Sequence, residues 1–285
     1  MLSISKDSLS NVSETIEIET TDPETTINVC KNWLKTRDFD AIGIASFGPI
    51  DLDVSSNSYG SILQTPKALW RNYPILSQFA EFGVPIGFDT DVNAAALAEL
   101  YSGVGISRKI TSLCYVTVGT GVGVGVIVNG HPVHGALHPE AGHIYAPSKE
   151  ASSSFQGVCP FHGNCIEGMV SAGSIASRKG IPASQLESLQ DEDAVWDLIA
   201  EQLAHLCLTL TLVVSPQCIV LGGGVMQRKV LFPLIRRHFS RLMHGYVQTK
   251  YLEDMELYIT PSSFSAGSGV LGSLQLAERA LSLRQ

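Results

Sequence analysis

Short apolar runs alternate with amphipathic segments through the first part of the chain. Residues 15–19 alternate between polar and apolar positions, which is typical of a strand, and residues 41–45 and 84–88 are short apolar runs that predict buried strands. Apolar residues recur at helical spacing in residues 24–35 and 92–101, so we expect a helix in each segment. Strands that alternate with helices in this way predict an α/β fold.

The alternation continues to the end of the chain, with a glycine-rich hairpin in its middle. The hairpin is predicted at residues 119–125, GTGVGVG, and residues 129–130, Asn-Gly, are a second hairpin signal. Residues 148–163 are rich in Ser, Gly and Pro without periodicity, so we expect a long loop that needs internal support. The other predicted elements are strands at 112–118, 126–128 and 218–221 and helices at 192–214, 230–246 and 266–283.

Length and charge narrow the classes of partner. A chain of 285 residues with 45% hydrophobic content can bury the cores of two lobes. Its formal net charge of -8 gives no footprint for nucleic acid or for an anionic membrane surface. Residues 1–10 lack the apolar run of a secretory signal, and we see no stretch of the length of a membrane span, so we expect neither feature. Six cysteines are spread along the chain, which favours reduced thiols or metal ligands in a cytoplasmic protein with small-molecule partners.

Two cysteines and two histidines recur at short spacing in the middle of the chain. Two residues separate Cys159 from His162, two more separate His162 from Cys165, and His143 ends the preceding Glu-Ala-Gly-His stretch. Two thiolates and two imidazoles form the closed tetrahedral set that zinc prefers, so we predict a structural zinc site with these four ligands. The alternative is that two core cysteines and a loop histidine meet by chance.

Two carboxylates flank the predicted zinc ligands. Glu140 lies three residues before His143, and Glu167 lies two residues after Cys165. A metal that fixes the ligands therefore fixes these carboxylates nearby, where both could face one pocket and accept hydrogen bonds from vicinal hydroxyls. The alternative is a pair of solvated loop glutamates.

A third carboxylate, Asp91, lies where a predicted strand ends and a predicted helix begins. Open α/β sheets place ligands at this position. The carboxylate could take a proton from a substrate hydroxyl as a general base, an effect of roughly 10²- to 10⁴-fold on rate. The alternative is that Thr90 or Asp91 only caps the helix.

Two glycine-rich segments suit close approach of the backbone to phosphates. Gly119, Thr120, Gly121 and Gly123 form the first part of the hairpin, and residues 222–224, GGG, lie between a strand and a helix. No Gly-Lys-Ser/Thr follows the first segment, and no helix follows it as the dinucleotide-binding motif requires. A packing glycine or an ordinary tight turn would explain each segment taken alone.

The order of these motifs along nearly the whole chain resembles the ROK family of sugar kinases and repressors, and its fructokinase branch in particular. In many members three cysteines and a histidine form the signature loop, whereas here the middle ligand is His162, as in that branch. The residues that carry the resemblance are 46–51 (SFGPID), 65–70 (TPKALW), 90–95 (TDVNAA), 119–123 (GTGVG), 138–143 (HPEAGH), 159–167 (CPFHGNCIE) and 221–225 (LGGGV).

The resemblance implies an α/β, two-lobe actin-like ATPase (ribonuclease H-like) fold that phosphorylates a hexose with magnesium-ATP. One lobe would comprise residues 1–109, with helix 273–285 packed back on it, and the other residues 110–272. Asp91 would be the catalytic base. By resemblance the sugar would contact Gly48, Pro49, Thr90, Glu140, His143 and Glu167, and ATP would contact Gly119, Thr120, Gly121, Gly123, Gly222, Gly223, Gly224, Val225 and Met226.

One departure from the family pattern divides the functional hypotheses. Family members begin with a strand and a Gly-Gly-Thr hairpin that cradles the ATP phosphates, yet the first glycine here is Gly43. The chain therefore reads as starting one strand late, with the first strand and phosphate hairpin missing. The hypotheses are a fructokinase, a non-catalytic sugar-binding or scaffold protein, and a glucose or mannose kinase. A repressor would need a basic helix-turn-helix, which residues 1–41 do not supply. The family also suggests a homodimer.

Overall fold

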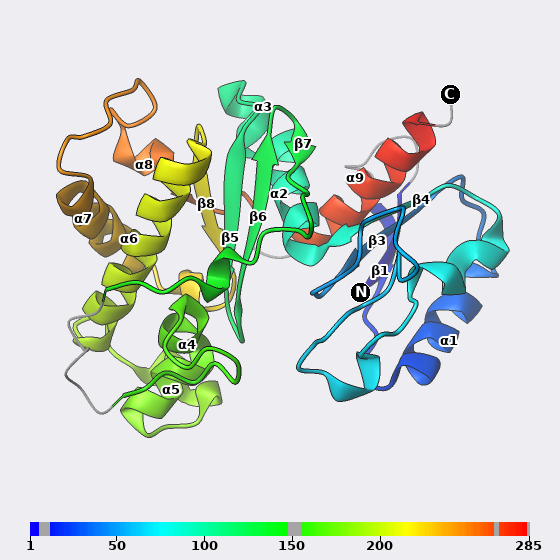
Figure 1. Ribbon diagram of the computed structural model, residues 1–285, viewed down its shortest axis with the longest axis horizontal. Coiled ribbons are helices and arrows are strands. Elements are labelled where there is room, and N and C mark those ends of the chain that lie inside the picture. The colour runs from blue at the N-terminus through cyan, green and yellow to red at the C-terminus, as the bar shows by residue number, and fades with distance from the viewer. Residues whose placement is uncertain (6–11, 148–154, 265–267, 284–285) are drawn as a thin grey trace. The chain divides into compact units, whose positions relative to one another are not determined.

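The computed structural model describes residues 1–5, 12–147, 155–264 and 268–283, so residues 148–154 of the predicted 148–163 loop and residues 266–267 of the helix predicted at 266–283 lie outside the described residues. The chain divides into two compact units (Figure 1). Unit 1 comprises residues 1–109, 131–139 and 264–285, and unit 2 comprises residues 110–130 and 140–263. These units differ from the predicted lobes in residues 131–139 and 264–272, which both belong to unit 1.

Four strands of unit 1 form two separate pairs. β1 (Leu2–Ser5) pairs antiparallel with β2 (Val12–Ile16), and β3 (Ile42–Ser46) pairs parallel with β4 (Ile86–Thr90). The predicted strand at residues 15–19 was therefore placed too late, because the stretch after Ile16 is not paired. The other elements of unit 1 are α1 (Pro23–Leu34), α2 (Asp91–Ser102), α3 (Val104–Arg108), β7 (His131–Pro132) and α9 (Ser268–Ser282).

Glycines let α9 lie directly on the β3 and β4 backbone. A Cβ built on Gly43 would lie 1.7 Å from the Ser273 carbonyl oxygen, and one built on Gly87 would lie 2.1 Å from that of Leu276. Since no side chain fits at these positions, helix and strands meet backbone to backbone. This contact holds the first half of β3 and of β4 directly against α9.

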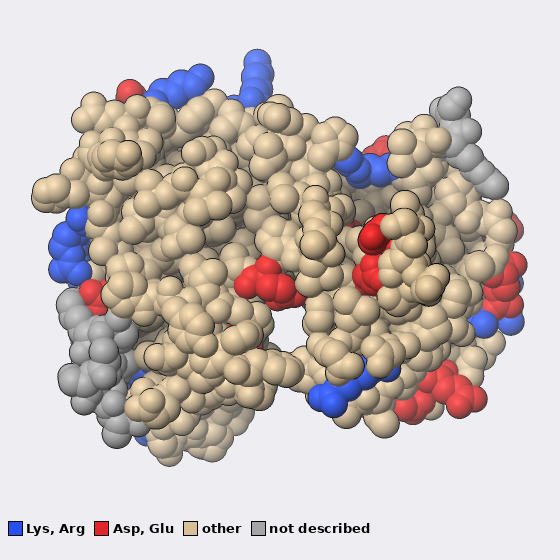
Figure 2. Space-filling view, in the orientation of Figure 1, with Lys and Arg blue, Asp and Glu red and all other residues tan. Residues whose placement is uncertain are grey.

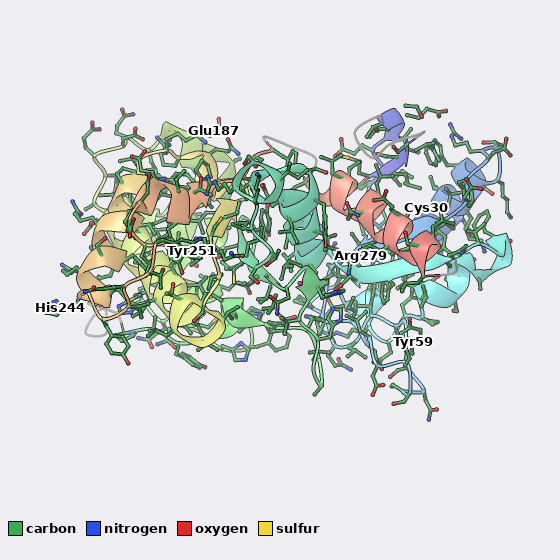
Figure 3. All side chains as sticks on the ribbon, turned by 90° about the horizontal axis from the view of Figure 1, so that it is seen from above. Cys30, Tyr59, Glu187, His244, Tyr251 and Arg279 are labelled. Carbon is green, nitrogen blue, oxygen red and sulfur yellow. The ribbon has the colours of Figure 1, made fainter. Side chains whose placement is uncertain are left out.

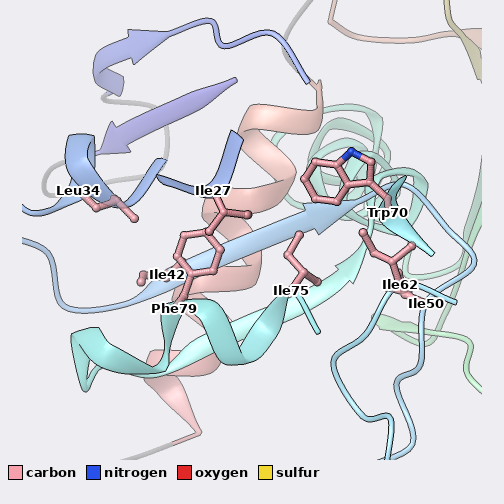
Figure 4. Close-up of a cluster of buried hydrophobic side chains, with 8 residues drawn as sticks. All are labelled: Ile27, Leu34, Ile42, Ile50, Ile62, Trp70, Ile75 and Phe79. Atoms are coloured by element: carbon pink, nitrogen blue, oxygen red, sulfur yellow. The ribbon is translucent and has the colours of Figure 1, made fainter. Parts of the chain in front are cut away.

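A cavity of about 450 Å³ lies within unit 1, and β1 and β3 both contribute to its walls together with α1 and α9. Among the described strands, β1 pairs only with β2 and β3 only with β4, so each has one edge without a ladder partner. Among the described residues that line the cavity, Asp91 alone has a charged side chain. The apolar cluster beside the cavity is shown in Figure 4 and consists of Ile27, Leu34, Ile42, Ile50, Ile62, Trp70, Ile75 and Phe79.

Unit 2 contains a continuous series of paired strands. The order is β6-β5-β8-β9; β5 and β6 form the predicted hairpin, and β8 is parallel to both of its neighbours. The strands are β5 (Leu113–Val118), β6 (Val122–Val128), β8 (Ile219–Gly222) and β9 (Ile259–Pro261). The helices are α4 (Ile166–Val170), α5 (Ala172–Lys179), α6 (Val195–Val214), α7 (Leu231–Met243) and α8 (Met255–Tyr258).

Helix α6 corrects one expectation from the sequence. It is long and apolar enough to cross a membrane by length and composition, whereas we expected no stretch of that length. In the structure 56% of its 18-residue apolar window is buried, and side chains such as Ile199, Leu203 and Leu206 are fully enclosed. Its apolar composition is thus explained by the core of unit 2.

Candidate functional site

The two histidines and two cysteines predicted as metal ligands come together in unit 2. One ligand atom from each of His143, Cys159, His162 and Cys165 lies within 4.8 Å of the others. His143 Nδ1 is 3.5 Å from Cys165 Sγ and 3.7 Å from Cys159 Sγ, and His162 Nδ1 is 3.8 Å from Cys159 Sγ. Metal bonds of about 2.0–2.3 Å in a tetrahedron separate their ligands by about 3.3–3.8 Å, so the cluster has the dimensions of a metal site.

Short local elements hold these ligands in place. His143 ends the 3₁₀ turn Ala141–His143, and Cys165 is the N-cap of α4. Cys159 and Gly163 exchange two backbone hydrogen bonds, of 2.9 and 3.2 Å, which close the loop around His162. Burial raises the pKa of the Cys165 thiol to about 11. A cation is the group that would ionise such a thiol at neutral pH.

The two carboxylates beside the cluster have different surroundings. Glu140 Oε2 lies 3.9 Å from His143 Nε2, the ring nitrogen on the opposite side from the sulfurs, and its side chain is 41% exposed. Glu167 lies in the first turn of α4, and its Oε2 accepts a hydrogen bond from the Val122 N–H at 3.0 Å. The structure thus places Glu140 on the metal-ligand histidine and Glu167 on the glycine hairpin.

The two glycine segments meet at the carboxyl edge of the unit 2 sheet. β5 and β8 are parallel partners, with Thr117 opposite Gly222, so the turns that follow them are neighbours. The atom nearest to a Cβ built on Gly119 is the Gly224 nitrogen, at 3.9 Å. Gly223 has a φ of 91°, which favours glycine. The carboxyl edge of parallel strands is where α/β sheets bind ligands.

Two residues predicted to contact ATP have buried side chains. Val225 and Met226 form the 3₁₀ turn after the triple glycine, and they are 8% and 1% exposed. These values describe whole residues, so the backbone of Met226 is buried as well, and its contact with a nucleotide stays a prediction. Thr120, by contrast, is exposed at the tip of the hairpin.

Asp91 is the first residue of α2 in unit 1, and it is not the residue that caps this helix. Thr90 is the N-cap, and its Oγ1 accepts a hydrogen bond from the Asn93 N–H at 3.1 Å. Desolvation raises the pKa of the Asp91 carboxyl, while the amides of Val92 and Asp91 and the Lys67 ammonium oppose this shift. A carboxylate free of the cap and with a raised pKa is suited to accept a proton.

Gly48 and Pro49 follow β3, whose last residue pairs with the last residue of β4. Ser46 lies opposite Thr90, so the Gly48–Pro49 segment and Asp91 leave the same end of the strand pair. The peptide bond between Gly48 and Pro49 is cis. The structure therefore brings these predicted site residues of unit 1 to one edge.

A buried carboxylate that sequence analysis missed supports this edge. Asp89 is 2% exposed; its Oδ1 accepts from the Thr90 N–H and from Asn93 Nδ2, each at 2.7 Å. Its Oδ2 lies 3.0 Å from His134 Nε2. The Thr90 N–H and the Asn93 amide thus donate to this buried carboxylate, and His134 Nε2 also donates in the tautomer that carries its proton there. The spacing of Asp89 and Asn93, four residues apart across a strand end, is the sequence signal that could have found the pair.

Histidines also fasten residues 131–139 to the rest of unit 1. His131 Nδ1 lies 3.0 Å from the guanidinium of Arg279 on α9, which Figure 3 labels. His138 Nε2 accepts a hydrogen bond from the Ile50 N–H at 3.1 Å. Burial lowers the pKa of His138, which keeps its ring neutral and its nitrogen able to accept.

Comparisons with known proteins agree on the family. The sequence profile of the ROK family matches residues 10–280. The chain is 40% identical over 268 residues to a putative fructokinase of Bacillus subtilis (strain 168), covering 93% of this chain and 88% of the relative. It is 37% identical over 269 residues to a fructokinase of Lactococcus lactis subsp. cremoris, covering 94% and 89%.

Solved structures share the fold. A ROK family glucokinase from Streptomyces griseus, in complex with glucose and AMPPNP, has a TM-score of 0.73 at 20% identity and covers 96% of this chain and 94% of its own. A ROK hexokinase from Thermus thermophilus has a TM-score of 0.69 at 22% identity, with 91% and 86% covered. The predicted α/β fold of the actin-like ATPase class is therefore confirmed. The chain belongs to the ROK family.

Proposed function

We propose that this protein is a fructokinase that transfers the γ-phosphoryl group of ATP to the 6-hydroxyl of D-fructose. The observation that carries the proposal is the start of α2, where Thr90 provides the cap and leaves the Asp91 carboxylate available. The names of the curated relatives, fructokinases at 36–40% identity, give the choice of fructose.

In this proposal Asp91 accepts the proton of the 6-hydroxyl while the hydroxyl oxygen forms a bond to the γ-phosphorus and the bond to the ADP oxygen breaks. Its raised pKa makes the carboxylate a better base than an ordinary aspartate. Buried Asp89 holds the turn that carries it. Phosphoryl transfer otherwise requires positioning and charge stabilisation, the latter supplied in part by Mg²⁺ that enters with ATP.

The proposed sugar and nucleotide contacts are those that the family resemblance implies. Glu140 is partly exposed and adjoins His143, so it is suited to accept hydrogen bonds from sugar hydroxyls. The sugar contacts are Gly48, Pro49, Thr90, Glu140, His143 and Glu167. The nucleotide contacts are Gly119, Thr120, Gly121, Gly123, Gly222, Gly223, Gly224 and the backbone of Val225 and Met226.

The metal of the cluster is proposed to be a structural zinc ion. Two sulfur and two nitrogen ligands at tetrahedral separations suit Zn²⁺ and leave no position open for a reacting water. His143 would bind it through Nδ1, which faces the sulfurs, and would keep Nε2 for Glu140 or a sugar hydroxyl. The zinc would brace the loop and take no part in the reaction.

A second candidate is a sugar-binding or scaffold protein without catalysis. The open edges of β1 and β3 favour it, because the described residues of unit 1 provide neither a strand between them nor a glycine hairpin for phosphates. A glucose or mannose kinase is a third candidate, since the same carboxylates could accept equatorial hydroxyls.

The proposed partners are the sugar and ATP, with a homodimer as a proposal from the family. The colouring of Figure 2 shows Lys and Arg as scattered groups on the face in view, without a continuous basic surface among the residues coloured there. This distribution does not support a nucleic-acid partner. Six free cysteines and the use of ATP support a cytoplasmic location.

The test is a sugar-dependent ADP-release assay with fructose, glucose and mannose, with ³¹P NMR to identify the product. We expect fructose 6-phosphate and the highest kcat/KM for fructose. Asp91→Asn should lower kcat by roughly 10²- to 10⁴-fold, and Asp40→Asn, an exposed control, should not. Because the pKa of Asp91 is raised, turnover should fall at a higher pH than it would for an ordinary aspartate as the solution is acidified.

Each outcome of this assay decides between the candidates. Fructose binding without ADP release from the unmodified chain would favour the non-catalytic protein. A higher kcat/KM for glucose or mannose would overturn the choice of sugar. Undiminished turnover in Asp91→Asn would remove Asp91 from the mechanism.

A further inference from the structure

We propose that Glu167 couples metal binding at the His143, Cys159, His162 and Cys165 cluster to the shape of the glycine turn, residues 119–122, so that nucleotide affinity depends on the metal. The nucleotide part of this inference rests on the proposed kinase function. The coupling itself rests on contacts within unit 2 and can be measured without a nucleotide.

Glu167 contacts the glycine turn at its most crowded point. Its Oε2 accepts the Val122 N–H at 3.0 Å, and a Cβ built on Gly121 would lie 2.6 Å from the same oxygen. The carboxylate therefore occupies the space that any side chain at position 121 would need. A hydrogen bond from a backbone N–H to a carboxylate is stronger than a neutral one, so it fixes the start of β6.

The position of Glu167 depends in turn on the metal cluster. Cys165, one of the four ligands, caps α4 by accepting from the Gly168 N–H at 3.5 Å, and Glu167 lies in the first turn of this helix. Helix α4 spans five residues. So short a helix has little stability of its own, and its direction is set by what holds its ends.

Two further contacts join the cluster side of the chain to the same turn. A Cβ built on Gly142, next to His143, would lie 1.9 Å from the Val122 carbonyl oxygen, so these backbones touch. The Ala172 N–H, at the start of α5, donates to the Gly119 carbonyl at 2.8 Å. The glycine turn is thus held by three segments that adjoin or follow the metal ligands.

These bonds also determine which donors remain for a phosphate. Glu167 takes the Val122 N–H, and the Gly119 N–H bonds to the Gly121 carbonyl at 2.9 Å. Among the described residues, the N–H groups of Thr120 and Gly121 have no partner. The Thr120 hydroxyl is exposed beside them. We infer that a phosphate would bind to these groups at the tip of the turn, provided that Glu167 keeps the turn in this shape.

The primary measurement is hydrogen exchange of the Val122 amide. In Glu167→Ala with metal bound, exchange should be about 10- to 100-fold faster, because a hydrogen bond to a charged group is lost. Glu167→Gln keeps a carbonyl oxygen as acceptor and should restore most of the protection. Glu192→Ala, which removes an exposed carboxylate of unit 2, is the matched control and should match the unmodified chain.

The second measurement separates coupling from simple damage to the metal site. Zinc content should stay near one equivalent in Glu167→Ala, since all four ligands remain. Removing zinc from the unmodified chain should speed Val122 exchange by about as much as Glu167→Ala does. Removing zinc from Glu167→Ala should speed Val122 exchange little further. The coupling would be overturned if zinc removal sped Val122 exchange as much in Glu167→Ala as in the unmodified chain, so that the two effects added. It would also be overturned if Val122 exchange did not respond to zinc at all.

The nucleotide part is tested by titration with ATP. We expect Glu167→Ala to weaken ATP binding by about tenfold and Glu167→Gln by less, with zinc bound throughout. If ATP fails to bind the unmodified chain while Val122 still responds to zinc, the proposed function fails and the coupling stands. If ATP binds equally well with and without zinc, the metal dependence is refuted while the kinase proposal is unaffected.

Discussion

Both units of this chain combine strands with helices, but the strands are paired more continuously in unit 2 than in unit 1. In unit 2 the strands form one paired series, β6-β5-β8-β9. In unit 1 the four strands β1 to β4 form only two pairs, and a cavity of about 450 Å³ lies between walls that include β1 and β3. Open strand edges and a cavity both represent contacts that are not made. We therefore expect unit 1 to open more easily than unit 2.

The proposed functional groups are also divided between the two units. The His/Cys cluster and both glycine turns belong to unit 2, and the turns follow β5 and β8, each of which has a partner strand on both sides. Asp91 belongs to unit 1 and lines the cavity. The proposed base is therefore carried by the less complete unit, and the buried Asp89 network is the local support that holds it.

Zinc removal should change this comparison most, because it removes the brace of the more complete unit. If zinc is present at 1,000 times its dissociation constant, its loss should cost about 4 kcal/mol, which corresponds to a fall of roughly 10 °C in the melting temperature. Hydrogen exchange by unit should show the loss in unit 2 amides near Cys159 and Cys165. An effect spread equally over both units would contradict the assignment.

Asp89→Ala should have the next largest effect and should act on unit 1. It leaves the Thr90 N–H, Asn93 Nδ2 and His134 without their acceptor, which we expect to cost about 3 kcal/mol. Asp89→Asn keeps one acceptor oxygen and should cost about 1 kcal/mol. Denaturant unfolding measures both, with exposed Asp40→Ala as control. A cost no greater than that of the control would show that this network does not support α2.

Adding one or two methyl groups inside each unit should have the smallest effect on stability, and the sign of that effect should differ between the units. Ala45 lines the cavity from β3, so Ala45→Val adds apolar atoms to open space and should stabilise unit 1 by about 1 kcal/mol. Val116 on β5 is fully buried, and Val116→Ile should instead destabilise unit 2 by about 1 kcal/mol through overpacking. Destabilisation by both changes would show that the cavity cannot accept added volume.

Elements in which apolar residues recur with a clear helical or strand period were predictable from the sequence. The helix expected at residues 24–35 is Pro23–Leu34, and that expected at 92–101 is Asp91–Ser102. The hairpin around residues 119–125 was also confirmed, although β6 begins within the glycine run at Val122. These features depend on neighbours in the chain, so local pattern is enough to define them.

The strands at the N-terminus were less predictable. The expected strand at residues 15–19 lies instead at Val12–Ile16, and the pattern did not predict β1 as a separate strand. Strand limits depend on which partner forms the ladder. Pairing between β1 and β2 is a contact between segments whose polar, hydroxyl-rich residues give a weak period-two signal.

The sequence by itself determined the residue types of the site: four metal-ligand residues at short spacing, a carboxylate at a strand end, and two glycine segments. Only the tertiary structure decided what each carboxylate contacts. Glu140 adjoins His143, Glu167 holds the Val122 N–H, and Asp89 is buried beneath Thr90. Spacing along a chain fixes which groups are near one another only within a turn or a loop, and contacts between distant segments follow from how strands pair and helices pack.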